Sequence, residues 1–201
     1  LKDEANAWFV GEPFKVFYDY KKEGIWQLGE EAAAAANGQE PGDIKVQDVD
    51  GNGVITTDDR IIYSQRPDVT FGFNNTFNYK GFDLSVFLYA RLGQWIAYDY
   101  NTTYRINALE NGGNVDYWTP ENPTNAFPRP NKSKSYTQVT YYSTLKYEDG
   151  SFFKIRDITL GYTFKPELLK HLNLSRLRVY ATAKNFFTFS KIDNYDPEQG
   201  G

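Results

Sequence analysis

The sequence predicts an all-β chain that forms part of a large antiparallel transmembrane β-barrel with long extracellular loops. Aromatic residues make up 17% of the chain, and four segments alternate apolar and polar side chains with the two-residue period of a strand. Two of these segments run for about ten residues, the length that crosses a membrane, whereas strands of globular proteins average about 5–6 residues. A soluble β-sandwich would show the same alternation with its apolar face inward, so it stays as the alternative fold.

Composition and motifs exclude several functional classes. The net charge of −4 offers no basic surface for nucleic acid. Cysteine is absent, which excludes a disulfide framework and a thiolate metal site. His171 is the single histidine and has no nucleophile at motif spacing, so we predict that the chain is not an enzyme. No apolar run has the length of a transmembrane helix, and no signal peptide is visible.

The first third of the chain predicts short elements joined by a long connection. Residues 8–20 are expected to be extended, and residues 24–27 to form a short return strand. Residues 30–36 are rich in alanine and predict a brief helical turn that ends at Asn37. Residues 21–68 as a whole are then one long loop.

A long β-hairpin follows. Aromatic side chains at 71, 73, 77 and 79 share one face of a strand over residues 70–79, opposite small polar residues. Lys80 and Gly81 form a tight turn, and residues 82–92 alternate in the same way. The hairpin therefore has one apolar face and one mostly polar face.

Two further strands are predicted in the second half, after a long segment at residues 99–150. A loop of that length is expected to be functional or packed on itself. Residues 151–164 form a strand in which Phe153 and Ile155 are out of phase with the apolar residues that follow, which predicts a β-bulge near residues 156–157. A link with a helical turn at 165–173 leads to the last strand, residues 176–189.

Lys154 and Arg156 lie within the third of these strands. A cation on the lipid face at the middle of the membrane costs roughly 2–4 kcal/mol. We therefore expect both side chains to face water or to lie near the rim of the barrel.

Loop lengths predict an orientation. Outer-membrane barrels have short periplasmic turns and long external loops, so residues 21–68 and 99–150 are expected outside the cell. A membrane barrel needs about eight strands to close, more than this sequence supplies. We therefore expect residues 1–201 to be an incomplete C-terminal portion of a barrel domain, with strands missing at both ends.

Residues 48–59 have the spacing of a calcium-binding loop. Oxygen ligands occur at alternate positions, and Gly53 stands where such a loop turns sharply. The predicted ligands are the side chains of Asp48, Asp50, Asn52, Thr56 and Asp59 and the carbonyl of Val54. Asp59 replaces the usual glutamate and is one methylene shorter, which favours a weaker site. The alternative is an acidic, glycine-rich surface turn held by side-chain-to-backbone hydrogen bonds.

Nearly the whole chain resembles the C-terminal portion of SusC/RagA-family TonB-dependent transporters of Bacteroidetes outer membranes. Eight motifs carry the resemblance in the family's order. They are residues 10–13 (VGEP), 24–27 (GIWQ), 41–45 (PGDIK), 71–76 (FGFNNT), 79–84 (YKGFDL), 117–124 (YWTPENPT), 158–164 (ITLGYTF) and 177–180 (LRVY).

The resemblance implies a function. Members of the family are outer-membrane barrels of about 22 strands with a plug domain, and they import oligosaccharides or peptides with energy from the TonB complex. A SusD-like surface lipoprotein covers the extracellular mouth as a lid. The plug, the TonB-contacting segment and the final strand have no counterpart in this sequence. The expected partners are thus the lid, the TonB complex, a glycan or peptide substrate and outer-membrane lipid, without nucleic acid.

Residues 117–124 are candidates for contact with the lid or the substrate. The predicted contact residues are Tyr117, Trp118, Glu121 and Asn122. The alternative is a rigid loop in which the prolines and the tryptophan pack against the barrel rim. The expected Ca²⁺ is structural and stiffens the external loop near this contact.

A soluble calcium-dependent β-sandwich that binds carbohydrate is the alternative function. A dockerin loop also ends in aspartate, but dockerins carry two such loops, each followed by a helix. This sequence has one such loop, and the segment at residues 60–67 is too short for that helix.

Overall fold

The computed structural model describes residues 2–14, 16–98, 114–134, 138–192 and 196–198. The strands of its largest sheet pair in antiparallel fashion. The chain divides into two units: unit 1 comprises Leu1–Gln65 and Trp95–Glu148, and unit 2 comprises Arg66–Gln94 and Asp149–Gly201. None of the described helices has the length and apolarity that crossing a membrane requires.

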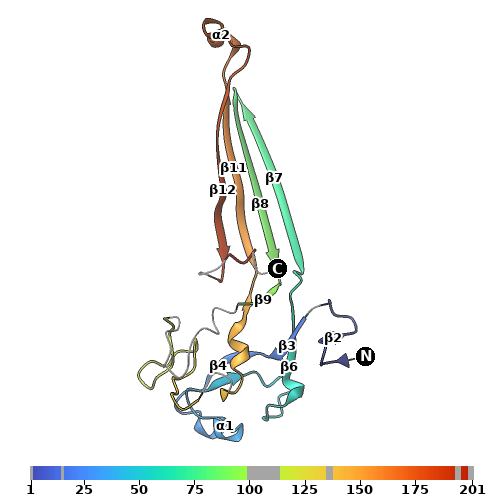
Figure 1. Ribbon diagram of the computed structural model, residues 1–201, viewed down its shortest axis with the longest axis vertical. Helices are drawn as coiled ribbons and strands as arrows, with labels where there is room; N and C mark the ends of the chain where they lie inside the picture. Colours follow the sequence, from blue (N-terminus) through green and yellow to red (C-terminus); the bar gives the residue numbers. More distant parts are fainter. Residues whose placement is uncertain (1, 15, 99–113, 135–137, 193–195, 199–201) are drawn as a thin grey trace. The chain divides into compact units, whose positions relative to one another are not determined.

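Unit 2 is built on one four-stranded sheet with the strand order β12-β11-β8-β7 (Figure 1). Its strands are β7 (Val69–Tyr79), β8 (Phe82–Leu92), β11 (Phe152–Thr163) and β12 (Arg178–Ser190). All four strands were predicted, with bounds that differ by at most two residues. Their lengths of 11 to 13 residues are about twice the globular average.

The turn between β7 and β8 follows from its two central residues. Lys80 and Gly81 have φ angles of 47° and 91°, as in the left-handed two-residue turn that matches the twist of a hairpin. A side chain at Gly81 would lie 2.8 Å from the carbonyl oxygen of Thr163, so the turn also needs glycine for space.

The predicted bulge is confirmed, and it keeps one face of the sheet apolar. Ile155 pairs with Leu88 and Asp157 with Phe87, which leaves Arg156 as the extra residue of β11. The register with β12 also shifts here, next to Asn185 with a φ of 50°. Because of the bulge, the apolar residues on both sides of it point to the same face.

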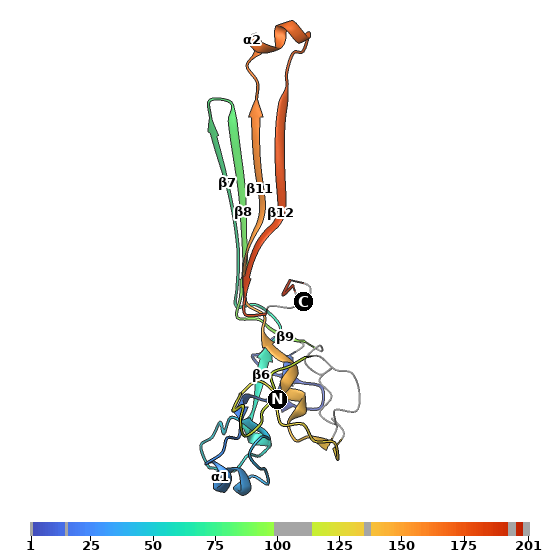
Figure 2. The same cartoon turned by 90° about the vertical axis from the view of Figure 1, so that its left-hand side faces the viewer.

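The link between β11 and β12 contains two short helical turns at one end of the sheet (Figure 2). They are α2 (Pro166–Leu169) and η5 (Lys170–Leu172), in agreement with the predicted helical turn. Leu169 is buried, and His171 is exposed as expected for a surface residue of a turn.

Unit 1 consists of short strand pairs and helical turns. The pairs are β1 (Lys2–Asp3) with β2 (Trp8–Phe9), β3 (Val16–Tyr20) with β6 (Arg60–Ser64), β4 (Lys22–Ile25) with β5 (Ile44–Val46), and β9 (Trp95–Ala97) with β10 (Tyr147–Asp149). The helical turns are α1 (Glu31–Ala36), η1 (Thr57–Asp59) and η4 (Tyr142–Lys146).

A compact apolar core holds unit 1 together. It is formed by Ile25, Ile44, Val46, Trp118, Tyr142 and Leu145. The core thus joins β4 and β5 to residues about 100 positions later in the chain. The predicted return strand exists as β4, but its partner is β5, which lies beyond α1, rather than the segment before it.

Candidate functional site

The candidate calcium loop lies between β5 and β6. Two glycines shape it, because Gly51 and Gly53 have φ angles of 73° and 85°, where other residues are strained. No atom lies within 4 Å of the place where a side chain would begin at either glycine. Backbone conformation rather than crowding therefore selects glycine here.

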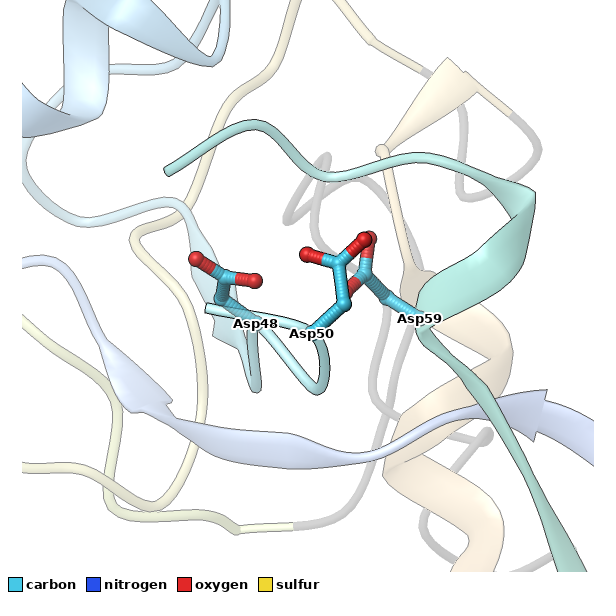
Figure 3. Close-up of side chains that lie close together, drawn as sticks. All are labelled: Asp48, Asp50 and Asp59. Atoms are coloured by element: carbon cyan, nitrogen blue, oxygen red, sulfur yellow. The ribbon is translucent and has the colours of Figure 1, made fainter. Parts of the chain in front are cut away.

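The structure brings three of the predicted ligands together. The carboxylates of Asp48, Asp50 and Asp59 each offer an oxygen, and these oxygens lie within 4.8 Å of one another. Figure 3 shows the three side chains gathered on the same side of the turn. In the described part of the chain, no lysine or arginine forms an ion pair with any of the three.

Asp59 is the most constrained of the three. Its carboxylate is fully buried and accepts hydrogen bonds from the backbone N–H groups of Thr56 at 2.7 Å and Val49 at 2.8 Å. The bond from Thr56 is the main cause that holds the pKa of Asp59 below its ordinary value, against the opposing effect of burial. The hydrogen bonds of the loop therefore favour the charged form of Asp59.

Asp48 and Asp50 hold the turn and remain nearer to solvent. Asp48 accepts hydrogen bonds from the N–H groups of Gly51 and Gly53 at 2.8 and 2.7 Å, and Asp50 accepts one from that of Asn52 at 3.0 Å. A carboxylate has about four acceptor positions, so these bonds leave lone pairs for a cation.

The other three predicted ligands belong to the same turn. Asn52 accepts a hydrogen bond from the N–H of Val54 at 2.8 Å, and the Thr56 hydroxyl accepts one from the N–H of Asp58 at 3.2 Å. The donor set is thus carboxylate, amide, carbonyl and hydroxyl oxygen, which suits a hard cation such as Ca²⁺.

Two contacts tie the loop to the rest of unit 1. Ile55 packs against the apolar core. Its N–H donates to the side chain of Asn37 at 3.0 Å. The sequence identified Asn37 only as a helix terminator, because a side-chain acceptor for a loop 18 residues away has no local signal.

The predicted contact segment at residues 117–124 is rigidly held. Trp118 is 5% exposed, and its indole N–H donates to Gln27 at 2.8 Å. Tyr117, Glu121 and Asn122 are exposed, although Asn122 also donates to Asp116 at 2.8 Å. A partner that docks on this segment therefore has three of the four predicted side chains available.

Comparisons with known proteins show that the chain is similar to TonB-dependent receptors. No family model matches it. TonB-dependent receptor P3 of Formosa agariphila is 33% identical over 98% of this chain and 20% of its own length. TonB-dependent receptor SusC of Bacteroides thetaiotaomicron is 32% identical over 75% of this chain and 15% of its own length.

Solved structures agree with these relatives. The structure of the RagAB peptide transporter matches with a TM-score of 0.67 and 24% identity, over 96% of this chain and 21% of that one. The RagAB peptide importer in its "open-open" state matches with a TM-score of 0.64 and 25% identity, over the same shares. All of these proteins are receptors or transporters by name.

The chain spans about a fifth of the length of the curated relatives that it matches. The match nevertheless covers almost all of its own residues, and both sequence and fold support it. The chain is therefore homologous, over nearly all of its length, to a part of the SusC/RagA-type TonB-dependent receptors.

Proposed function

We propose that the four-stranded sheet of unit 2 is part of the wall of an outer-membrane β-barrel, in a TonB-dependent importer of peptides or oligosaccharides. The apolar face of the sheet is the observation that carries the proposal. Phe77, Tyr79 and Val179 are 60%, 69% and 57% exposed. Such a surface is rare in water-soluble proteins and suits lipid.

The cross-strand register arranges this face in rows. Two central rows consist of Asn75, Val86, Ile158 and Ala183, and of Phe77, Leu84, Leu160 and Ala181. The rows nearer the two ends hold most of the aromatic residues: Phe71, Phe73, Phe153, Phe187 and Phe189 at one end, and Tyr79, Phe82 and Tyr162 at the other.

Aromatic rows on both sides of an aliphatic band are typical of the girdles of membrane barrels. A strand of 11 residues that rises about 3.4 Å per residue and tilts by about 40° spans roughly 25 Å along the membrane normal. That distance matches the apolar band of an outer membrane, so the strand length supports the same assignment.

The opposite face suits the lumen of a transporter. It carries charged and hydroxyl side chains, including an ion pair between Arg178 and Asp83 at 2.5 Å and a hydrogen bond between Thr159 and Thr182 at 2.9 Å. The soluble-sandwich alternative needs a second sheet on the apolar face, and the described residues of unit 2 supply none.

The partners follow from the homology. We propose a SusD-like surface lipoprotein as the lid over unit 1, the TonB complex as the energy source, and a peptide or glycan as cargo. The RagAB structures are those of a peptide transporter, which supports a peptide. The long segments of unit 1 are then extracellular.

Calcium has a structural part in this proposal. A Ca²⁺ ion held by Asp48, Asp50, Asn52, Thr56, Asp59 and the carbonyl of Val54 would neutralise the three carboxylates. It would also fix Ile55 against the core that contains Trp118. Chelation is expected to weaken lid docking while the barrel stays intact.

A matched pair of arginine substitutions in β8 tests the membrane assignment. Val86 lies in the middle of the apolar face, and its neighbour Ser85 lies on the polar face. Val86→Arg is expected to destabilise the inserted protein by about 2–4 kcal/mol and to lower its amount in the outer-membrane fraction. Ser85→Arg is expected to change it little. Equal effects of the two substitutions would contradict a lipid-facing sheet.

A further inference from the structure

A buried lysine on the polar face of the unit 2 sheet is the starting point. Lys154, in β11, is 1% exposed although it lies on the face that suits the lumen. The sequence predicted that it faces water or lies near the rim. It is on the polar side, but the chain's own residues 196–198 cover it.

These residues supply carboxylates to two cations. The Lys154 ammonium lies 3.1 Å from both carboxylate oxygens of Asp196 and 2.8 Å from Oε2 of Glu198. Arg156 forms an ion pair with Oε1 of Glu198 at 3.2 Å. One carboxylate thus bridges the two cations.

The covering segment is shaped for this contact. The N–H of Glu198 donates to Oδ1 of Asp196 at 3.1 Å, which turns both carboxylates toward the same partner. Pro197, between them, is fully buried. The segment therefore occupies a fitted position, and its contact with the sheet goes beyond loose charge attraction.

The polar face holds a further cation beside this site. The guanidinium groups of Arg91 and Arg156 lie 5.7 and 5.3 Å from the ring centroid of Tyr89. Within the described residues, Arg91 forms no ion pair with a carboxylate. The three cations at this site therefore outnumber the two carboxylates that residues 196–198 supply.

A buried ammonium group is strongly unfavourable without a partner of opposite charge. If residues 196–198 leave, Lys154 must either become hydrated or accept another carboxylate. The site consequently favours a replacement that resembles the segment itself, with two carboxylates two residues apart.

We propose that Lys154 and Arg156 form a binding site for acidic peptides on the polar face of the sheet, which residues 196–198 occupy until such a peptide displaces them. Where the sheet lines a transport lumen, this site would select acidic segments of the cargo. This selection of cargo rests on the proposed function, whereas the binding site itself does not.

Peptide binding to the purified full-length protein tests the proposal. The probe is a fluorescent acetyl-Asp-Pro-Glu-amide, and the change is Asp196→Asn with Glu198→Gln, which removes the competing carboxylates. Removal of a tethered competitor is expected to tighten probe binding by at least about tenfold. Adding Lys154→Met is expected to abolish the gain, whereas Lys154→Arg, which keeps the charge, should retain part of it.

Two controls make the test specific. Acetyl-Asn-Pro-Gln-amide should not bind, and Lys191→Met, which removes a lysine that is 77% exposed and paired with Asp149, should leave probe binding unchanged. Equal affinity of the parent and the double variant, or binding that survives Lys154→Met, would overturn the proposal. Tighter binding of trigalacturonate than of the probe would overturn its assignment to peptides.

Outer-membrane fractionation of the same variants separates the two proposals. A protein that binds the probe as expected but does not reach the outer membrane would refute the proposed function and leave the binding site standing. A membrane-inserted protein without the expected binding would do the reverse.

Discussion

Individual residues of the candidate calcium loop differ in their structural roles. Asp59 is buried and holds backbone N–H groups, whereas Asp50 is exposed and holds only its own turn. Both carboxylates are predicted ligands, but only Asp59 is expected to contribute strongly to the stability of the metal-free loop.

Substitution of these two carboxylates tests that division. Asp50→Asn is expected to weaken calcium binding by at least about tenfold, because it removes a charged ligand, and to leave the melting temperature in EDTA unchanged. Asp59→Asn is expected to lower stability by about 1–3 kcal/mol even in EDTA, because one buried N–H loses its acceptor. The measurement is thermal unfolding with and without calcium. A parent protein whose melting temperature does not respond to calcium would contradict the metal site.

Gly42 sets the distance between two distant segments of unit 1. Its φ is 89°, and a side chain there would lie 2.7 Å from both the Trp118 ring and Arg129 Cδ. Gly42→Ala is therefore expected to destabilise unit 1 by roughly 2–5 kcal/mol, through backbone strain and overpacking together. Chemical denaturation measures the loss.

Gly29→Ala is the matched control for this substitution. Gly29 has nearly the same φ, 94°, but no atom within 4 Å of the new side chain. Gly29→Ala should therefore lower the stability of unit 1 by about 1–2 kcal/mol, through backbone strain alone. Equal losses at the two positions would show that close packing at Gly42 is unimportant.

Residue patterns predicted some site members and not others. Asp48, Asp50 and Asp59 were found because their spacing lies within one short loop. Asn37, Asp196 and Glu198 were not, because their partners are 18, 42 and 44 residues away. Such contacts form only when the chain folds, so no pattern within a short sequence segment predicts them.

At the scale of elements, the bulge in β11 decides which side chains face which way. Arg156 is the extra residue, and the bulge that it forms keeps Phe153 and Ile155 in phase with Ile158. A regular strand of the same sequence would turn Lys154 to the apolar face.

Two changes of chain length test the role of the bulge. Insertion of one alanine after Asp157 adds a residue beyond the one that the bulge holds. Because a one-residue slip reverses the faces of a strand, the insertion is expected to lower the folded, membrane-inserted fraction severalfold, with about 2–4 kcal/mol from Lys154 on the lipid face. Deletion of Arg156 should behave nearly as the parent does, because Ile155 and Asp157 already pair with the consecutive residues Leu88 and Phe87. Gel quantification of the outer-membrane fraction measures both. A harmless insertion would mean that the register does not fix the faces of β11.

Element prediction succeeded where one pattern decides the structure. The four long strands follow from strict alternation, and the tight turn at Lys80 and Gly81 follows from local backbone preference. The pairing of β4 with β5 and the short elements β9, η4 and β10 were not predicted. The core that joins β4, β5 and η4 also contains Trp118, so their packing depends on residues far apart in the sequence.

At the scale of the whole molecule, the two units differ in where their apolar residues lie. Unit 1 buries its apolar residues in a core, whereas unit 2 exposes an entire apolar face. Strand length and alternation predicted the apolar face of unit 2, whereas the core of unit 1 was not predicted. No pattern in the sequence indicated that residues 196–198 cover Lys154, since acidic residues in a loop are usually hydrated.

One measurement tests directly whether the apolar face of unit 2 meets lipid and the opposite face meets water. Because the chain has no cysteine, single cysteines introduced along β8 at positions 83–88 can be labelled with a membrane-impermeant maleimide in intact cells. Labelling is expected with a period of two, at positions 83, 85 and 87, and protection is expected at 84, 86 and 88. Uniform labelling of both faces would contradict this arrangement.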